Sequence, residues 1–407
     1  MGAARAGGFA HGLRLAFGFM PDGGGQFHPV ALGDCLSQAR GVSPMRVLMV
    51  SHFYESHLGG IERVAGHVLR QMAALGAQVE WAASAQDAPP QDMACLPLPC
   101  INPTEALTGL PMPIPGPRGI IALWRAVGRA QAAVVHDGLY VTSILALAMA
   151  KLRGRPVVLI QHIAGIPFAS ALMRGVMAMA NAVVTRPMLA AADRLVFISD
   201  TVRRDLLGDP ARRDYSLLFN GVDAAVFTAN GAAERPVVAK GKVALFVGRF
   251  VEKKGLSILR EVARRRPEDQ FLLAGAGPLA PQDWGLPNVH VLGPQTPEQL
   301  AALYRGADVL LLPSVGEGYP LVIQEAMACG LPVICGAPTH LADPDAGAFL
   351  HGVPVALEDV AGSADRVAQA LDAPLPDAAQ RAEMAAWAAA RYDWRAMAGR
   401  ILQLAAG

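Results

Sequence analysis

From Met45 onward, short apolar runs alternate along the chain with longer segments that have the periodicity of helices. The run Arg46–Ser51 (RVLMVS) is largely apolar, as expected of a strand that is covered on both faces. Strands and helices that alternate in this way form parallel sheets, because a crossover helix must return the chain to the starting edge. The alternation therefore predicts an α/β fold with doubly wound parallel sheets.

The alternation falls into two blocks of similar size that join near residue 222, after the turn signal Asn220-Gly221. We expect the two halves to face each other across a cleft, which is the default ligand site of such a fold. The expected strands are 46–51, 79–83, 132–136, 156–161, 194–199, 242–248, 271–274, 288–292, 308–312 and 332–335. The expected helices include 61–75, 140–152, about 168–190, 296–305 and 392–404.

Two stretches lack this pattern. Residues 1–44 are rich in glycine and alanine without periodicity, which predicts a disordered N-terminal extension and makes Met45 a candidate initiator. Residues 86–117 are crowded with prolines and predict a long loop with little regular structure, of the kind that often serves a binding site.

The composition excludes several classes of protein. With 53% hydrophobic and 17% charged residues among 407, the chain can bury a large core. The net charge of +1 offers no global field for nucleic acid, so we expect no nucleic-acid partner, and neither a collagen nor a coiled coil fits. The mean hydropathy of +0.32 is high and indicates an apolar surface or a membrane neighbour.

The compartment is predicted from the cysteines and from the uncharged stretches. Five cysteines, without a C-x-x-C pair, indicate free thiols in a reducing compartment. The longest uncharged stretch, Pro156–Met173, contains Gln161, His162 and two prolines, so we expect a buried strand and loop rather than a membrane span. The apolar patch Leu13–Met20 is too short for a secretory signal, and we expect a cytoplasmic protein.

The densest chemical signal is Ser314–Gly330 (SVGEGYPLVIQEAMACG), where a strand, a glycine loop and a helix that begins near Tyr319 follow one another. The start of such a helix offers free N–H groups and a positive dipole end to an anion such as phosphate. Glu317 and Glu325 lie about 12 Å apart along a helix, which suits the two ends of a diphosphate-linked ligand. The alternative is a pair of surface glutamates on an ordinary amphipathic helix.

A second signal is Phe246–Leu256 (FVGRFVEKKGL), where Arg249 and Lys254 follow the carboxyl end of a strand. Two cations there would neutralise a phosphate, although a solvated charged turn is an equal alternative. Gly275–Ala280 (GAGPLA) matches the dinucleotide fingerprint formally. Pro281 follows at once, and the next strand closes on Gly293 instead of an acidic residue, so a tight turn is favoured.

Weaker signals lie in the first block and near the end of the second. Gly59-Gly60 precede a helix, so the backbone there could approach a ligand. His136 and His162 each end a strand at the edge that faces the cleft, although a lone histidine is usually structural. The pattern Asp343-Pro344-Asp345 favours a turn over a metal site, and we expect no bound metal.

These motifs together resemble the retaining glycosyltransferases of the GT-B fold, in glycosyltransferase family 4, from about Met45 to the C-terminus. EGYPLVIQEAMACG resembles the E-x7-E signature of that family, VGRFVEKKGL its diphosphate clamp and LFNGVDAAVF its interdomain link. LLAGAGPL resembles its G-x-G-P turn and SHFYESHLGGIER its Gly-Gly loop. The resemblance implies an acceptor-side domain at 45–222, a donor domain at 223–389 and a helix at 390–407 that packs back onto the first domain.

The resemblance also implies roles for single residues. Arg249 and Lys254 would hold the diphosphate as a leaving group, and Glu317 would contact the sugar near the reacting carbon. Glu325 would bind the ribose hydroxyls, and His136 would lie against sugar and acceptor, although many members have a second histidine nearby where this chain has Asp137. The implied catalytic residues are His136, Arg249, Lys254 and Glu317. The implied donor-binding residues are Gly60, Gly248, Arg249, Lys254, Gly275, Gly277, Gly318, Tyr319, Pro320, Leu321, Val322 and Glu325.

The implied reaction is the transfer, with retention, of a hexose from a UDP- or GDP-linked donor to a glycan or lipid-linked acceptor, in cell-envelope polysaccharide or glycolipid synthesis. No cofactor other than the nucleotide diphosphate sugar is implied. The apolar helix Phe168–Ala192, with Arg174 and Arg186, could lie on the inner face of a membrane, or it could be a buried crossover helix. Three alternatives stay open: an NAD-dependent oxidoreductase, a catalytically silent glycan-binding or assembly protein, and a sugar-nucleotide epimerase.

Overall fold

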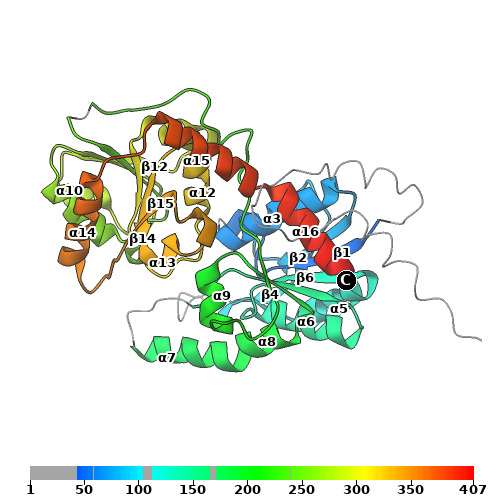
Figure 1. The fold of residues 1–407 in the computed structure, drawn as a ribbon. Coiled ribbons are helices and arrows are strands. Elements are labelled where there is room, and N and C mark those ends of the chain that lie inside the picture. The colour runs from blue at the N-terminus through cyan, green and yellow to red at the C-terminus, as the bar shows by residue number, and fades with distance from the viewer. Residues whose placement is uncertain (1–43, 58, 104–111, 166–170, 239) are drawn as a thin grey trace, which may run out of the picture. The chain divides into compact units, whose positions relative to one another are not determined.

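The computed structural model describes residues 44–57, 59–103, 112–165, 171–238 and 240–407, with the side chains of 171–174 left undescribed. The extension predicted for residues 1–44 lies outside these ranges, apart from Pro44. Residues 45–407 form one compact unit that contains two parallel sheets, as the alternating pattern predicts (Figure 1). In the described part of the chain, no helix combines the length and the apolarity that crossing a membrane requires.

The first sheet has the strand order β3-β2-β1-β6-β7-β8-β9, and every strand pair in it is parallel. Its strands are β1 (Arg46–Val50), β2 (Gln78–Ser84), β3 (Cys95–Leu98), β6 (Ala132–His136), β7 (Val157–Gln161), β8 (Arg194–Phe197) and β9 (Ser216–Leu217). Val47 and Met49 point into the core on one face, while Leu48 and Val50 point into the core on the other. This burial on both faces explains why the strand is apolar throughout.

Helices cover both faces of the first sheet. On one face lie α3 (Gly60–Ala74) and α16 (Trp394–Ala406). On the other lie α5 (Pro117–Arg129), α6 (Val141–Leu152), α8 (Arg186–Ala191) and α9 (Asp200–Leu207). The long helix predicted over 168–190 is helical in its described part: α7 (Ala171–Ala180) continues through a π-helical turn (Asn181–Thr185) into α8.

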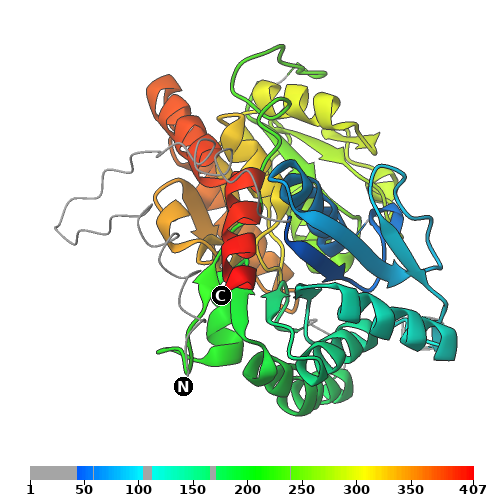
Figure 2. The ribbon, with the colours of Figure 1, turned by 90° about the vertical axis from the view of Figure 1, so that its right-hand side faces the viewer.

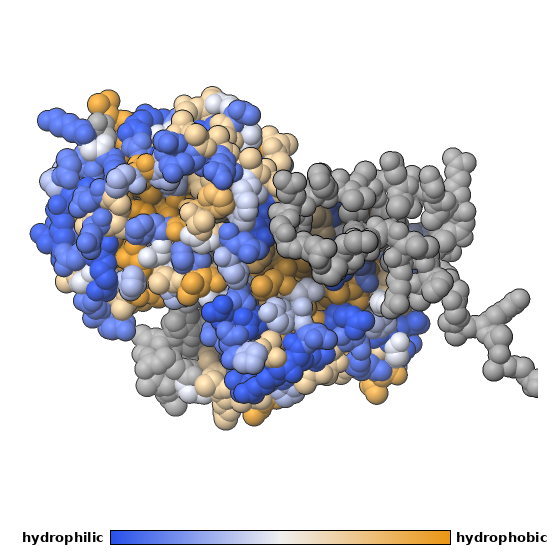
Figure 3. All heavy atoms as spheres, viewed as in Figure 1, coloured by the Kyte–Doolittle hydropathy of each residue, from blue (hydrophilic) through white to orange (hydrophobic). Residues whose placement is uncertain are grey.

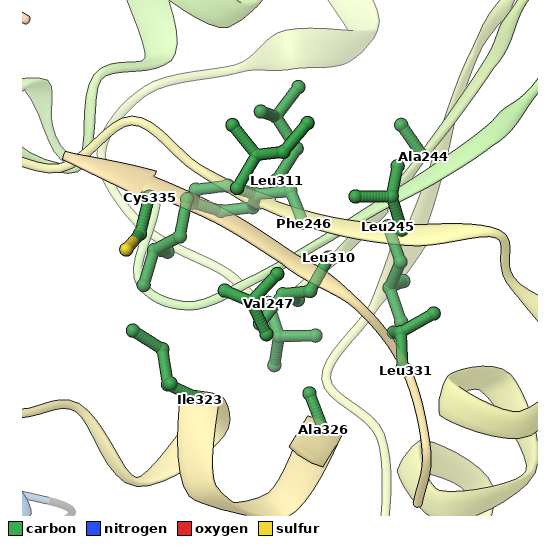
Figure 4. Packing of buried hydrophobic residues seen from close by; sticks show 14 of the residues in the cluster. Ala244, Leu245, Phe246, Val247, Leu310, Leu311, Ile323, Ala326, Leu331 and Cys335 are labelled. Carbon is green, nitrogen blue, oxygen red and sulfur yellow. The ribbon is translucent and has the colours of Figure 1, made fainter. Parts of the chain in front are cut away.

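The second sheet has the order β12-β11-β10-β13-β14-β15 and is also parallel. Its strands are β10 (Val243–Val247), β11 (Gln270–Ala274), β12 (Val289–Gly293), β13 (Val309–Leu312), β14 (Val333–Gly336) and β15 (Leu350–Val353). Its helices are α10 (Leu256–Arg265), α11 (Pro297–Gly306), α12 (Leu321–Ala328), α13 (Ala337–His340), α14 (Val360–Asp372) and α15 (Ala378–Arg391). Figure 4 shows Ile323 and Ala326 of α12 packed beside Val247 and Leu310 of the central strands. This packing fixes the start of α12 at the carboxyl edge of the sheet.

Some local predictions need correction. The proline-rich segment 86–117 contains β3, and β4 (Cys100–Ile101) pairs antiparallel with β5 (Ile114–Pro115). Proline is tolerated in β3 because this strand lies at the edge of the sheet, where one row of N–H groups needs no partner. The edge strand β15 was also missed, because His351 and Gly352 interrupt its apolar run.

The C-terminal segment connects the two halves. Met384 and Ala388 of α15 lie in the core of the second half, whereas Met397 of α16 lies in a core of the first. Asp393 separates the two helices and caps α16. Figure 2 shows α16 beside α3, against which it packs. The exact division of the chain into domains at residue 222 stays a prediction.

Candidate active site

The loops that precede α10 and α12 lie against each other at the carboxyl edge of the second sheet. Gly255, the N-cap of α10, has a left-handed φ of 76°, and a Cβ atom there would overlap the carbonyl oxygen of Pro313. In this arrangement the Lys254 Nζ is 2.9 Å from a carboxylate oxygen of Glu317, and both side chains are largely buried. Two residues with predicted catalytic roles thus form an ion pair.

Arg249 lies in the same loop as Lys254, directly after β10. Its side chain is exposed and makes no hydrogen bond or ion pair with any residue that the structure describes. The other carboxylate oxygen of Glu317 is buried without a hydrogen bond and lies 3.8 Å from Lys253 Nζ. The loop after β10 therefore carries one cation, Arg249, that has no partner among the described residues. It also carries Lys254, whose partner Glu317 keeps one carboxylate oxygen without a hydrogen bond.

The predicted glycines bring the loops after β10 and β11 into backbone contact. A Cβ atom at Gly275, which has a φ of 144°, would overlap the carbonyl oxygen of Gly248, and one at Gly277 would lie 2.5 Å from that of Phe250. A 3-10 turn over Pro281–Trp284 follows, with no α-helix before β12. A dinucleotide fingerprint needs a helix immediately after its glycines, so the structure favours the tight turn that the sequence predicted.

The helix α12 begins at Leu321, with Pro320 as its N-cap, two residues later than predicted. The N–H groups of Leu321 and Val322 lie in the first turn, where a helix offers no internal acceptor. The ring of Tyr319 is buried, and its hydroxyl lies 2.8 Å from the hydroxyl of Tyr392. The side chain of Tyr319 is therefore occupied in the core.

Glu325 lies in the middle of α12 and is almost completely buried. Tyr304 of α11 donates a hydrogen bond of 3.1 Å to its carboxylate. Burial raises the pKa of Glu325, although the positive charge of Arg63 and the bond from Tyr304 oppose the shift. Arg63 belongs to α3 of the first half, so the electrostatics of Glu325 depend on both halves.

On the first half, His136 and His162 come together at the ends of β6 and β7. Nδ1 of His136 lies 2.9 Å from Nε2 of His162, and both rings are buried. Burial lowers the pKa of His136 to about 3, so the ring is neutral at pH 7. His162, which ends the neighbouring strand β7, thus lies beside His136, whereas Asp137 occupies the position at which many members of the family have a second histidine.

Asp137 holds these two strand ends together. It is the one non-glycine residue of the described ranges with a positive φ (55°), a conformation that aspartate tolerates better than most residues. Its Oδ1 accepts hydrogen bonds from the backbone N–H groups of His162 (2.8 Å) and Ile163 (3.4 Å), and its Oδ2 is buried without a partner. Burial raises its pKa to about 7.

A third histidine of the site and a glutamate were missed by the sequence analysis. Nε2 of His52, just after β1, lies 2.8 Å from Oε1 of Glu62 in the first turn of α3, and the His52 ring stacks on Tyr140. Burial alone would raise the pKa of Glu62, but the hydrogen bond and charge of His52 hold it below its ordinary value. Both residues lie in the SHFYESHLGGIER motif, in which the sequence analysis assigned a role only to the glycines. Gly60 itself is exposed, and a Cβ there would meet nothing within 4 Å.

The two groups of residues meet at Gly318. A Cβ atom at Gly318 would lie 2.7 Å from the carbonyl oxygen of His162, so the E-x7-E loop lies against the histidine pair. Several buried polar atoms near this point have no partner in the described structure: His52 Nδ1, His136 Nε2, Asp137 Oδ2, Ser314 Oγ and Glu317 Oε1. Each such atom costs about 1–3 kcal/mol if it stays unsatisfied. Their convergence at the carboxyl ends of β1, β6 and β13 indicates a polar ligand site.

The predicted turn at Asp343-Pro344-Asp345 is confirmed as a 3-10 turn that Asp343 caps. The Asp343 carboxylate is buried and pairs with Arg391 (2.6 Å), so it is occupied by the protein itself. Within the described ranges no group of three His, Cys, Asp or Glu side chains could hold a metal ion. The expected independence from metal stays a prediction, as do the roles of the individual site residues.

Comparison with known proteins agrees with the motifs. Residues 58–226 match the family described as Glycosyltransferase Family 4, and residues 241–373 match Glycosyl transferases group 1. The chain is 34% identical over 237 residues to the D-inositol 3-phosphate glycosyltransferase of Mycolicibacterium smegmatis, which covers 53% of this chain and 52% of that protein. The corresponding protein of Mycobacteroides abscessus is 36% identical over 184 residues, covering 41% and 37%. The matched region thus spans about half the length of these curated relatives or less.

Solved structures share the fold over most of the chain. Sucrose-phosphate synthase from Thermosynechococcus elongatus superposes with a TM-score of 0.68 at 20% identity, covering 88% of this chain and 98% of that one. WaaG, a glycosyltransferase involved in lipopolysaccharide biosynthesis, gives 0.59 at 16% identity, covering 89% and 100%. At these identities the likeness shows the fold alone, which is the GT-B fold. The two family matches, which together span most of the chain, show that it belongs to the family 4 and group 1 glycosyltransferases.

Proposed function

We propose that the protein is a retaining glycosyltransferase that moves a hexose from a nucleotide diphosphate sugar to a hydroxyl group of a glycan or lipid-linked acceptor. The observation that carries the proposal is the Lys254–Glu317 ion pair, 2.9 Å long, beside the free first turn of α12. Lys254 and the N-terminus of α12 suit the diphosphate of such a donor. Glu317 and Glu325, which are eight residues apart, suit its sugar and its ribose.

The diphosphate would be held without a metal. The dipole and N–H groups of the first turn of α12 favour two negative phosphates, and Lys254 and Arg249 add two positive charges at the same corner. As the bond between the sugar and the diphosphate breaks, its electron pair moves to the phosphate oxygen. Fixed cations stabilise this charge as it develops, and they need no reorganisation at that moment.

The two carboxylates divide the remainder of the donor between them. Glu325 would accept hydrogen bonds from the ribose hydroxyls, in the orientation that Tyr304 fixes. Glu317 would contact the sugar near its reacting carbon. Its ion pair with Lys254 would hold this carboxylate beside the cation that binds the departing diphosphate. Nε2 of His136 would bind a hydroxyl group of the substrate, because Nδ1 contacts His162 and Nε2 has no partner in the described structure.

Transfer with retention follows if the acceptor oxygen attacks on the face that the diphosphate leaves. The acceptor O–H bond breaks as the new C–O bond forms, and the proton passes to the departing phosphate oxygen. No covalent intermediate with the enzyme is needed. Closure of the two halves over the site would exclude water and suppress hydrolysis of the donor.

The setting of the reaction is proposed from the relatives and from the fold. The named relatives are D-inositol 3-phosphate glycosyltransferases, and the GT-B protein HepE of Anabaena has been solved with UDP-glucose (TM-score 0.60, 17% identity). These names support a nucleotide sugar donor and a polar or phosphorylated acceptor. We place the reaction on the cytoplasmic side of the inner membrane, in the synthesis of envelope polysaccharide or glycolipid.

The donor is tested by thermal shift of the full chain against UDP, GDP, ADP, their sugars and NAD. A ligand at 100 times its dissociation constant stabilises the folded protein by about 2.7 kcal/mol, which is easily measured. One nucleoside diphosphate and its sugar should raise the unfolding temperature of the wild type, and the Glu325→Ala variant should lose that shift. Glu298→Ala, on an exposed turn of the same half, is the matched control and should keep it.

Other outcomes would favour the alternatives. A shift with NAD alone would support the oxidoreductase, and no shift with any compound would support a glycan-binding or assembly protein. Interconversion of two nucleotide sugars in the absence of an acceptor would support the epimerase.

A further inference from the structure

The positive charge of the chain is concentrated in one segment. Residues 101–192 contain eight Lys or Arg and two Asp or Glu, a net charge of +6, although the whole chain has a net charge of +1. One of the two acidic residues, Asp137, is buried, and the other, Glu105, lies outside the described residues. Within the described ranges, this segment therefore exposes no Asp or Glu side chain of its own.

The same segment forms one helical layer of the first half. α5 packs on α6, α6 contacts α8, and α8 continues through the π-helical turn into α7. Figure 1 shows these helices following one another along the same side of the sheet. Much of the outer side of α5 and α7 is exposed in the described structure, whereas the opposite face of the sheet is covered by α3 and α16.

Exposed apolar side chains gather at both ends of this layer. Most of the large hydrophobic residues that are exposed in the described structure lie here. At the α5 end they are Ile101, Ile114, Ile120, Ile121, Trp124 and Leu152. At the α7 end they are Val176, Met179 and Val183. Figure 3 shows hydrophobic residues reaching the surface among hydrophilic ones along the lower edge of the same view.

The cations are arranged around the apolar groups. Arg118 and Arg125 lie on the exposed face of α5 and have no partner among the described residues, and the Arg153 guanidinium lies 3.9 Å from the ring centre of Trp124. Arg186 is exposed at the start of α8, near the α7 end. Two further cations of the layer are paired at its border, Lys151 with Asp193 and Arg129 with Glu80.

We propose that this layer, defined as the exposed faces of α5 and α7 with the connecting α6 and α8, docks on a bilayer that contains anionic lipids. Trp and Ile side chains enter the boundary between headgroups and acyl chains, and long Arg side chains reach back to the lipid phosphates. Positive charge near an anionic surface adds to this attraction. A nucleic acid would use the charge but leave the isoleucines unexplained, and a neutral partner would leave the charge unexplained.

The proposal gives the transferase a membrane face for a lipid-linked acceptor, so its biological setting rests on the proposed function. Binding to vesicles needs neither donor nor acceptor, however, and is measured separately. The full chain is sedimented with vesicles of phosphatidylcholine alone and with vesicles in which about one-third of the lipid is phosphatidylglycerol. Binding at least tenfold tighter to the anionic vesicles, weakened by salt, is expected.

Variants separate the apolar contribution from the charge. Ile121→Glu and Met179→Glu, each on an exposed side chain, should weaken binding to anionic vesicles at least tenfold, whereas Val238→Glu, which is 99% exposed in the other half, should change nothing. Arg118→Glu with Arg125→Glu should also weaken binding at least tenfold. The matched control is Arg260→Glu with Arg395→Glu, which changes the net charge by the same amount at exposed positions outside the layer. This control should bind the anionic vesicles as tightly as the wild type does.

Three results would overturn the proposal: no binding to either vesicle, equal binding to both, or loss of binding in the arginine variant while Ile121→Glu and Met179→Glu bind normally. The last result would indicate a soluble polyanion such as nucleic acid. The shift with nucleoside diphosphate is measured on the same preparations. Its absence from the wild type would refute the proposed transfer without affecting the vesicle result.

Discussion

The buried carboxyl of Asp137 gives the most direct test of the electrostatics of the site. Its pKa in the folded protein is raised to about 7 from 3.8 because the group is fully buried, and Oδ2 has no partner. The folded state therefore holds this proton more tightly than the unfolded state does. The contribution of Asp137 is most favourable below pH 3.8 and is lost as the pH rises toward 7.

The magnitude follows from these two values. One pKa unit corresponds to about 1.4 kcal/mol. The raised pKa therefore lowers the free energy of unfolding by about 1.7 kcal/mol at pH 5 and by about 4 kcal/mol at pH 8. Between pH 5 and pH 8 the wild type should thus lose about 2–3 kcal/mol of stability through this group. His136, His162 and Glu62 titrate in both proteins, so their direct contributions cancel when a variant is compared with the wild type.

The variant is Asp137→Asn. Asparagine tolerates the positive φ, and its side-chain oxygen can still accept from the N–H groups of His162 and Ile163. Urea unfolding at pH 5 and pH 8 gives the free energy of unfolding of both proteins. The advantage of the asparagine variant over the wild type should be about 2–3 kcal/mol larger at pH 8 than at pH 5. Parallel pH profiles would refute the reasoning, because they would mean that Asp137 is ionised in the folded state at pH 5.

Three further predictions concern residues that we propose to bind the donor or that contact such residues. Lys254→Ala should weaken the binding of the preferred nucleoside diphosphate at least tenfold in titration calorimetry, since a charge-assisted contact is lost; an unchanged dissociation constant would exclude this lysine from the clamp. Tyr304→Phe should cost about 1.5–3 kcal/mol of stability, because the buried carboxylate of Glu325 loses its donor, and urea unfolding with no change would contradict that bond. Gly275→Ala should lower the unfolding temperature because its Cβ overlaps backbone, whereas Gly60→Ala should leave that temperature unchanged and weaken donor binding. Equal unfolding temperatures for the two glycine variants would argue against the close packing.

Most of the fold could be predicted because its strands are buried on both faces. Residues such as Leu48 and Met49 must both be apolar, so the run stands out in the sequence whichever face each residue covers. The start of α11 was also predicted, since the helix expected over 296–305 begins at Pro297, where Thr296 and Gln299 form a local capping box that needs no distant partner. Signals of this kind depend on near neighbours and are visible in a single sequence.

The missed features depend on residues that are distant along the chain. The edge strand β3 forms because it pairs with β2, and no local sequence pattern indicates this pairing. His52 meets Glu62 only when α3 folds against the end of β1, and His162 meets His136 only when β7 pairs with β6. The sequence analysis therefore found the residues that carry motifs and placed His136 and His162 at one edge of the sheet, but it missed their direct contact and the His52–Glu62 pair.

The central claim is that the ends of the two sheets form one site that transfers a sugar with retention. The most direct test is to incubate the full chain with the nucleotide sugar that the thermal shifts select and with a hydroxyl acceptor, and to determine the anomeric configuration of the product by proton NMR. The account predicts release of the nucleoside diphosphate together with a glycoside that keeps the configuration of the donor, both abolished in Lys254→Ala. A glycoside of inverted configuration, or undiminished transfer by that variant, would contradict it.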